Sequence, residues 1–259
     1  AVAAVVTFDM LSINWRYLSH DDFVSQTSFQ QEFAGYPADH VISPEYQKQD
    51  VHFRVFPLSR NPFNDAMTAA HLRSIGGYNA AKIKRYQQLA DIHLLNPHNK
   101  KRYYGIQQKG GVTPYDITPQ VANMLNMKYL ITRAQYANQL RLPQYQLVRV
   151  AGPEAIFLNK ENLGPAWIVR NVKVVQSPDS ALIKLHDINT AKTAIIEAKD
   201  KDKLKSYSKD SIAPNEKIEL TYYSNDVLKY RYKSDKQRFV VFSEVYYPKG
   251  WTVTIDGKP

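Results

Sequence analysis

The chain has 259 residues, with 34 Lys and Arg against 24 Asp and Glu, and it contains no cysteine. This length allows a substantial core in one or two domains, and the lack of cysteine excludes disulfides and thiolate chemistry. The net charge of +10 would suit an anionic partner, but the cations are interleaved with acids and no nucleic-acid-binding motif is present. We therefore expect a solvated basic surface and no nucleic-acid partner.

The N-terminal stretch Ala1–Phe8 is uncharged and largely apolar. It fits either a buried strand or the last turns of a membrane-spanning helix, although no window reaches the roughly 20 apolar residues that cross a bilayer. Farther along, Asp21 and Asp22 are expected to cap a helix that runs to about Phe33. Residues that break helices then follow at Gly35, Pro37 and Pro44.

A Gly-Gly pair, Gly76–Gly77, follows a predicted strand over Val51–Phe56 and a predicted short helix over Ala66–His71. The pair is expected to lead straight into a helix that ends at Asn96. The apolar arc of this helix comprises Ile83, Tyr86, Leu89, Ala90 and His93, with Lys82 inside the arc and Arg85 at its edge. A long cation beside a buried face either extends to water or pairs with an anion.

The remainder of the chain is expected to be rich in strands. Two helices are predicted, a short one from Thr118 to Met127 and another from Pro178 to His186. The predicted strands are Lys128–Thr132, Tyr145–Val150, Ala155–Leu158, Ala166–Val169, Val172–Val175, Thr193–Glu197, Lys217–Tyr223, Val227–Tyr232, Arg238–Val245 and Trp251–Ile255.

These elements indicate an α+β protein with two domains. Residues 1–190 are expected to form a mixed α/β domain, and residues 191–259 an antiparallel β-sandwich. The sandwich is expected to be incomplete in this chain, because Asp256–Gly257 favours a hairpin turn and only two residues follow it.

The first candidate site is an anion site at Gly76, Gly77, Lys82 and Arg85. Backbone N–H groups at the start of a helix attract anions, and the two cations would add charge. The segment is neither a nucleotide-binding loop nor a dinucleotide fingerprint. The alternative is a tight turn followed by a helix whose cations pair with neighbouring acids.

The second candidate site is a group of aromatic residues near the C-terminal end, Tyr246, Tyr247 and Trp251. Such rings can stack on sugars, although aromatic residues of a sandwich more often belong to its core. The seven histidines show no metal-ligand spacing. We therefore expect no metal in this chain. We also assign it no cofactor and no catalytic residue.

Four segments resemble the YfhO-like family of bacterial multi-pass membrane proteins. Residues 73–87 resemble its "IGGYHgAKLrRYQ" stretch, residues 123–131 its "NMLNtKYfI", residues 163–169 its "L-P-R-A-[FW]-F-V", and residues 242–258 its "SExYYPkGWkxxIDGk" tail. The four lie in the family's order, and the resemblance extends over about Asp9–Pro259. Asn79 stands where the family pattern has His, so any role of that His is in doubt here.

The resemblance implies a large extracytoplasmic domain of a protein in the bacterial cytoplasmic membrane. The family is related to glycosyltransferases that use lipid-phosphate sugars, and their catalytic carboxylates lie in the membrane half. The implied partners are the transmembrane part of the parent chain and a polyprenyl-phosphate sugar or an envelope glycan. The domain is expected to assist acceptor or donor binding without catalysing the reaction alone.

Two other functions remain open at this point. One is a non-enzymatic module that binds glycan through Tyr246, Tyr247 and Trp251. The other is a structural domain that braces membrane helices or a dimer. An exposed apolar surface around Ala1–Phe8 and the C-terminal edge would favour the structural role.

Overall fold

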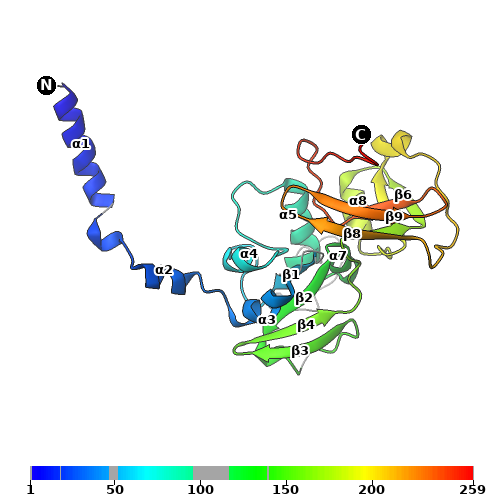
Figure 1. Ribbon diagram of the computed structural model, residues 1–259, viewed down its shortest axis with the longest axis horizontal. Coiled ribbons are helices and arrows are strands. Elements are labelled where there is room, and N and C mark those ends of the chain that lie inside the picture. Colours follow the sequence, from blue (N-terminus) through cyan, green and yellow to red (C-terminus); the bar gives the residue numbers. More distant parts are fainter. Residues whose placement is uncertain (1, 18, 47–51, 96–116, 139, 259) are drawn as a thin grey trace.

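The computed structural model describes residues 2–17, 19–46, 52–95, 117–138 and 140–258 (Figure 1). Helices and several sheets make up a mixed α+β fold, which confirms the predicted class. Ala1, Val51 and the segment 100–116, which was expected to be a loop, lie outside the described residues.

The N-terminal segment extends away from the body of the molecule (Figure 1). It contains helix α1 (Val2–Tyr17), a 3-10 turn η1 (His20–Asp22) and helix α2 (Gln26–Glu32). A buried strand at the start of the chain is therefore wrong, because α1 is helical and none of its residues is buried. The helix predicted from Asp21 is divided in two, since Ser25 caps α2 by accepting from the Ser28 amide at 3.1 Å.

The main sheet has four strands in the order β1-β2-β4-β3. These strands are β1 (Arg54–Pro57), β2 (Met127–Arg133), β3 (Tyr145–Ala151) and β4 (Glu154–Asn159). The β1–β2 pair is parallel, whereas β2–β4 and β3–β4 are antiparallel. Phe56, Leu130 and Phe157 are fully buried here and form part of one apolar cluster.

Helices and turns pack around this sheet. They are α3 (Pro37–Tyr46), α4 (Met67–His71), α5 (Lys84–Ala90), the π-helical turn η2 (Asp91–Leu95), α7 (Pro119–Met124) and the turn η4 (Ala134–Tyr136). The expected break at Gly35 and Pro37 separates α2 from α3, but the expectation that Pro44 breaks the chain is wrong, because it lies inside α3. Pro37 is its first residue, where a missing N–H costs nothing.

The remaining strands form three separate pairs. These are β5 (Ala166–Val169) with β10 (Phe239–Phe242), β6 (Asn171–Val175) with β7 (Thr193–Glu197), and β8 (Lys217–Tyr223) with β9 (Leu228–Lys233). The first two pairs cross the expected boundary at residue 190, and β6–β7 is parallel. A parallel pair needs a crossover, here α8 (Pro178–Lys184), and η5 (Ala198–Lys203) follows β7.

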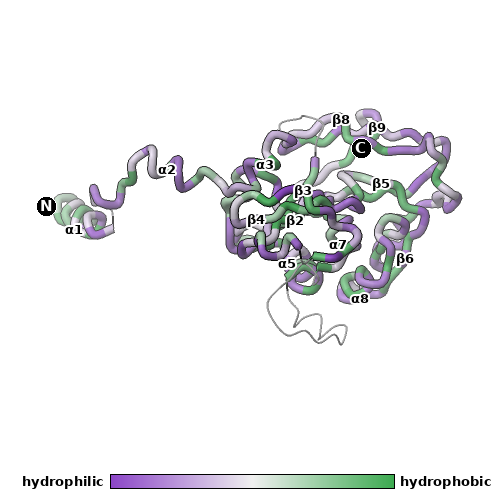
Figure 2. Tube along the Cα trace, turned by 90° about the horizontal axis from the view of Figure 1, so that it is seen from below, coloured by the Kyte–Doolittle hydropathy of each residue, from purple (hydrophilic) through white to green (hydrophobic). Residues whose placement is uncertain are grey.

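The predicted antiparallel sandwich is not confirmed, because the described strands from β5 onward form three separate pairs and no closed sheet. The strand predicted at Trp251–Ile255 is also wrong: the segment makes only an isolated bridge between Ile255 and Lys258. Figure 2 shows hydrophobic stretches inside the body of the molecule and also along α1, which lies away from the body.

Candidate functional site

The Gly76–Gly77 pair is required by a close approach of two backbone segments. A Cβ atom on Gly76 would lie 1.9 Å from the carbonyl oxygen of Pro62, and Gly77 has φ +116°. The Gly77 amide donates to that Pro62 oxygen at 2.6 Å, and the Gly76 amide donates to Ser74 Oγ at 3.0 Å. Both amides therefore bind acceptors within the chain.

Helix α5 begins at Lys84, so the prediction of a helix starting directly after Gly77 is wrong. The side chain of Asn79 accepts from the Ala81 amide at 2.8 Å, and Ile83 at the helix N-cap has extended backbone. An Asx turn of this kind competes with helical hydrogen bonding and delays the start of a helix. Lys82 consequently lies outside the helix.

The two candidate cations are not directed at a common point. Arg85 Nη2 lies 2.5 Å from Glu197 Oε1, where Lys199 also contacts the carboxylate at 2.8 Å. The hydrogen bond from Lys199, together with Arg85, holds the pKa of Glu197 below its usual range. Lys82 Nζ lies 3.4 Å from the Phe63 carbonyl oxygen. The structure therefore places Arg85 in a surface ion pair and Lys82 beside an aromatic residue.

The aromatic candidates lie outside the strand pairs. Tyr246 is 70% exposed and Tyr247 50%, while Trp251 is half-buried and donates from Nε1 to the Val245 carbonyl at 3.2 Å. A turn presents these rings, because the Gly250 amide donates to the Tyr247 carbonyl at 3.0 Å. The two tyrosine rings are therefore accessible to a ligand.

A polar cluster that sequence reasoning missed joins the main sheet to the C-terminal strands. Arg54 Nη2 lies 2.8 Å from Glu244 Oε2, and His52 Nε2 lies 3.0 Å from Glu244 Oε1. Burial pushes the pKa of Glu244 upward, but His52 and Arg54 together hold it below its usual value. The ring of Tyr223 packs edge-on against His52, with centroids 4.6 Å apart. The cluster therefore fixes the position of Glu244 relative to β1.

Three of the four segments that carry the family resemblance meet at Ser243. Its amide donates to the Pro165 carbonyl at 2.8 Å, and its Oγ donates to the Met124 carbonyl at 2.7 Å. The Leu163 amide in turn donates to the Asn123 carbonyl at 3.1 Å. These segments thus share a structural role, which is to hold α7 and the β5–β10 pair together.

Asn126 stabilises the same junction. It has φ 55°, its Nδ2 donates to the His52 carbonyl at 2.7 Å, and its Oδ1 accepts from Asn162 at 3.0 Å. Asparagine is one of the few residues that tolerate this left-handed conformation. The position combines a backbone requirement with two side-chain hydrogen bonds.

The described residues contain no cluster of three or more His, Asp or Glu side chains that could hold a metal ion. Within the same part of the chain, no helix has both the length and the apolar character needed to cross a membrane.

Comparison with known proteins identifies no family for this chain. No protein-family model matches the chain, and no curated protein or solved structure matches it either.

Proposed function

We propose that this chain is an accessory domain of a bacterial membrane protein, held at the extracytoplasmic face of the cytoplasmic membrane. In this proposal it assists the binding of an acceptor or a polyprenyl-phosphate sugar for a glycosyltransferase-like parent protein, and is not catalytic alone. The resemblance to YfhO-like proteins supports the parent protein and its substrate class. The observation that carries the membrane location is the exposure of α1.

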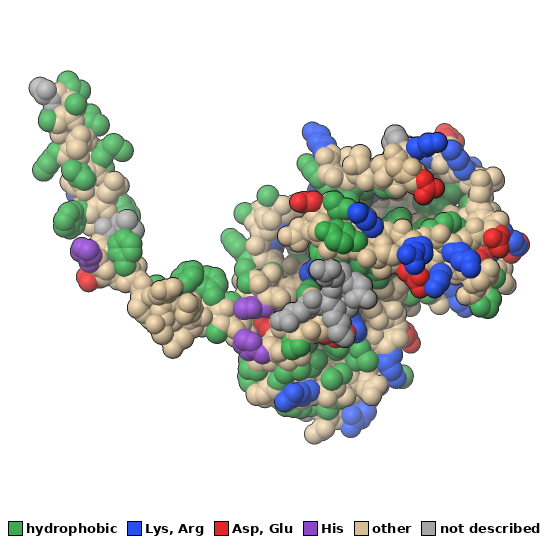
Figure 3. Space-filling model, in the orientation of Figure 1, with side chains coloured by type: hydrophobic (Ala, Val, Ile, Leu, Met, Phe, Trp, Pro, Cys, Tyr) green, Lys and Arg blue, Asp and Glu red, His purple; other side chains and the backbone are tan. Residues whose placement is uncertain are grey.

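Helix α1 exposes large apolar side chains along its whole length (Figure 3). Phe8 is 75% exposed and Trp15 79%, and Asp9 and Arg16 are the only charged residues among the 16 of the helix. The exposed apolar residues are Val2, Val5, Val6, Phe8, Met10, Leu11, Ile13, Trp15 and Tyr17. A helix that is apolar on all sides is normally buried in protein or lipid.

The energy available from covering α1 is large. Burial of one Val, Leu, Ile, Phe or Met side chain stabilises by about 1.5–3 kcal/mol. Only a few such side chains are therefore needed to hold the domain on a lipid surface, even with Asp9 and Arg16 kept at the headgroups. We retain the antiparallel sandwich of residues 191–259 as a proposal, which the antiparallel β8–β9 pair supports.

Vesicle flotation tests the membrane location. The chain should float with neutral phosphatidylcholine vesicles, and its Trp15 fluorescence should shift to the blue. The variant Phe8→Asp/Leu11→Asp should stay at the bottom of the gradient, whereas Val227→Asp, which changes an exposed valine on the body, should float like the original chain. Failure of the original chain to float, or flotation of the α1 variant, would refute the location.

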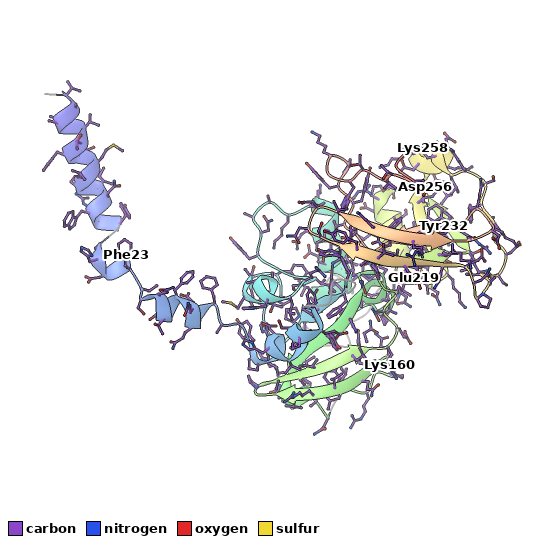
Figure 4. The ribbon with its side chains drawn as sticks, viewed as in Figure 1. Phe23, Lys160, Glu219, Tyr232, Asp256 and Lys258 are labelled. Carbon is purple, nitrogen blue, oxygen red and sulfur yellow. The ribbon has the colours of Figure 1, made fainter. Side chains whose placement is uncertain are left out.

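The exposure of Tyr246 and Tyr247 favours a second candidate function, glycan binding by a non-enzymatic module. Binding of purified envelope polysaccharide should weaken in Tyr246→Ala/Tyr247→Ala. The matched control is Tyr232→Ala, an exposed tyrosine on β9 (Figure 4). Equal binding by both variants would exclude this surface.

The structural alternative uses the same α1 surface. If α1 packs against a second copy of the chain, the original chain should sediment as a dimer without lipid and Phe8→Asp/Leu11→Asp as a monomer. If the chain is monomeric without lipid and floats with vesicles, the result favours the membrane location over packing of α1 in a dimer.

A further inference from the structure

A pocket of about 400 Å³ opens at one edge of the main sheet, and none of the predicted site residues lines it. Its lining includes Ser59 and Arg60 after β1, Arg133 at the end of β2 and Glu154 at the start of β4. The carboxyl ends of the parallel strands β1 and β2 share this edge. The volume lies within the usual range for small-molecule sites.

The floor of the pocket is a buried charge cluster. Arg60 Nη2 lies 2.6 Å from Glu154 Oε1, and the two side chains are 9% and 5% exposed. Arg60 Nη1 also contacts Asp39 at 3.3 Å, so two carboxylates share one guanidinium. Glu154 Oε1 accepts from Ser59 as well, at 2.7 Å. The floor therefore pairs the Glu154 carboxylate with the Arg60 guanidinium and presents both hydrogen-bond acceptors and donors.

One oxygen of Glu154 keeps capacity for a ligand. Within the described part of the chain, Oε2 accepts only from the Ala38 amide, at 3.2 Å. A carboxylate oxygen can accept two hydrogen bonds. A hydroxyl group from a ligand would fill this remaining capacity.

The rim supplies donors, and the walls supply apolar surface. Arg133 and Gln135 are exposed, and neither side chain makes a hydrogen bond or ion pair with the residues that the structure describes. This holds although Arg133 stands directly opposite Glu154 in the β2–β4 register. The Tyr36 ring is held against the Arg60 guanidinium, with 3.5 Å between centroid and Cζ, and Pro153 completes the wall.

We propose that this pocket binds a neutral polyhydroxylated molecule of about monosaccharide size. Hydroxyl groups both donate and accept, so they can donate to Glu154 and accept from Arg133 and Gln135. An anion would meet the Glu154 carboxylate, and an apolar ligand would cover Arg133 and Gln135 without supplying hydrogen-bond acceptors. This site adds a binding surface to the proposed function and does not depend on attachment of α1 to a membrane.

Saturation-transfer NMR on the full chain tests the pocket, with D-glucose, D-galactose and D-mannose as probes. At least one sugar should bind saturably. Arg133→Ala/Gln135→Ala, which changes exposed side chains and should fold normally, should weaken that binding by about tenfold or more. The control is Lys160→Ala, just beyond the opposite end of β4 (Figure 4), and it should bind like the original chain.

Three results would overturn the proposal: no saturable binding of any of the three sugars, unchanged binding in Arg133→Ala/Gln135→Ala, or an equal loss in Lys160→Ala. Inorganic phosphate and spermidine serve as charge probes. If either competes with the sugar more strongly than a second sugar does, the site recognises charge and the assignment to a neutral ligand is wrong. Vesicle flotation of the same pocket variant should be unchanged, so failure here is distinguishable from failure of the membrane proposal.

Discussion

Glu244 accepts a hydrogen bond from Arg54 at 2.8 Å, although 190 residues separate the two along the chain. Both side chains are largely buried, with exposures of 13% for Arg54 and 19% for Glu244. The pair connects the main sheet, through β1, to the segment that follows β10. The pair therefore forms only when the main sheet and the segment that follows β10 pack against each other.

Glu244→Ala should destabilise the chain strongly, because it leaves Arg54 as a buried charge without its carboxylate. We expect a loss of about 3 kcal/mol in the free energy of unfolding, measured by urea denaturation. The matched control is Glu219→Ala, which removes an exposed ion pair with Lys217 and should cost less than about 1 kcal/mol. If the two variants lose similar amounts of unfolding free energy, the buried pair does not hold the segment after β10 against the main sheet.

Gly76→Ala should be among the most harmful small substitutions in the chain. The new methyl group would collide with the Pro62 carbonyl, which is backbone and cannot rotate away. We expect a cost of about 3 kcal/mol or more, or failure to fold. Gly164→Ala is the comparison: Gly164 has φ +76° but nothing within 4 Å, so only about 1–2 kcal/mol of backbone strain is expected. Thermal unfolding of both variants measures the difference.

Substitutions at Asn126 should separate its two roles. Asn126→Gly keeps the left-handed backbone and loses the hydrogen bonds to His52 and Asn162, so we expect a cost of about 1–2 kcal/mol. Asn126→Ala loses the same bonds and adds about 1 kcal/mol of backbone strain. Chemical denaturation should give the stability order Asn, Gly, Ala. If Ala is as stable as Gly, backbone strain contributes nothing at this position.

Acid should weaken the fold partly through Glu216. Hydrogen bonds from Arg238 at 2.5 Å, and then from Ser234 and the Ala213 amide, lower the pKa of Glu216 to about 2 from an ordinary 4.5. A carboxyl with a lowered pKa in the folded state adds stability that is complete above its unfolded pKa. That stability is lost as the pH falls from about 4.5 toward 2.

Glu216→Gln should therefore be less stable than the original chain at neutral pH, and the gap should narrow at pH about 3. Unfolding free energies from urea titrations at several pH values measure this gap. Glu219→Gln serves as the control, because its carboxylate is exposed. A stability difference between Glu216→Gln and the original chain that stays constant between neutral pH and pH about 3 would contradict the lowered pKa of Glu216.

Local sequence signals predicted most of the elements in the body. Helix α8 begins at Pro178, as expected, because Ser177 caps it by accepting from the Ser180 amide at 3.1 Å. The β3–β4 hairpin also forms around Gly152, which has φ +58°. The start of α5 was missed because the Asn79 side chain satisfies a local amide, and helical periodicity carries no information on such competition.

Strand pairing could not be read from the sequence in the same way. Alternating apolar residues identify a strand such as β10 but do not specify its neighbour. Here β10 pairs with β5, and Phe242 stands opposite Ala166. A sandwich confined to residues 191–259 was therefore a reasonable expectation from spacing that the observed pairings do not confirm.

The candidate sites show the same limit. Sequence reasoning singled out Tyr246 and Tyr247, whose exposure fits a binding surface, but it could not find the pocket at Glu154. A carboxylate at the start of a strand has no sequence signal that links it to Arg60 in another loop. Proximity of this kind arises only when β1 and β4 are placed on either side of β2.

The contacts of Ser243 also have a consequence for the order of events during synthesis. The Met124 carbonyl and the Arg54 guanidinium find their partner in Ser243, which leaves the ribosome long after both. A nascent chain that ends before residue 243 therefore lacks both contacts, and β1 cannot yet pack against the segment that follows β10. A chaperone that binds the emerging chain would have its longest opportunity during this wait.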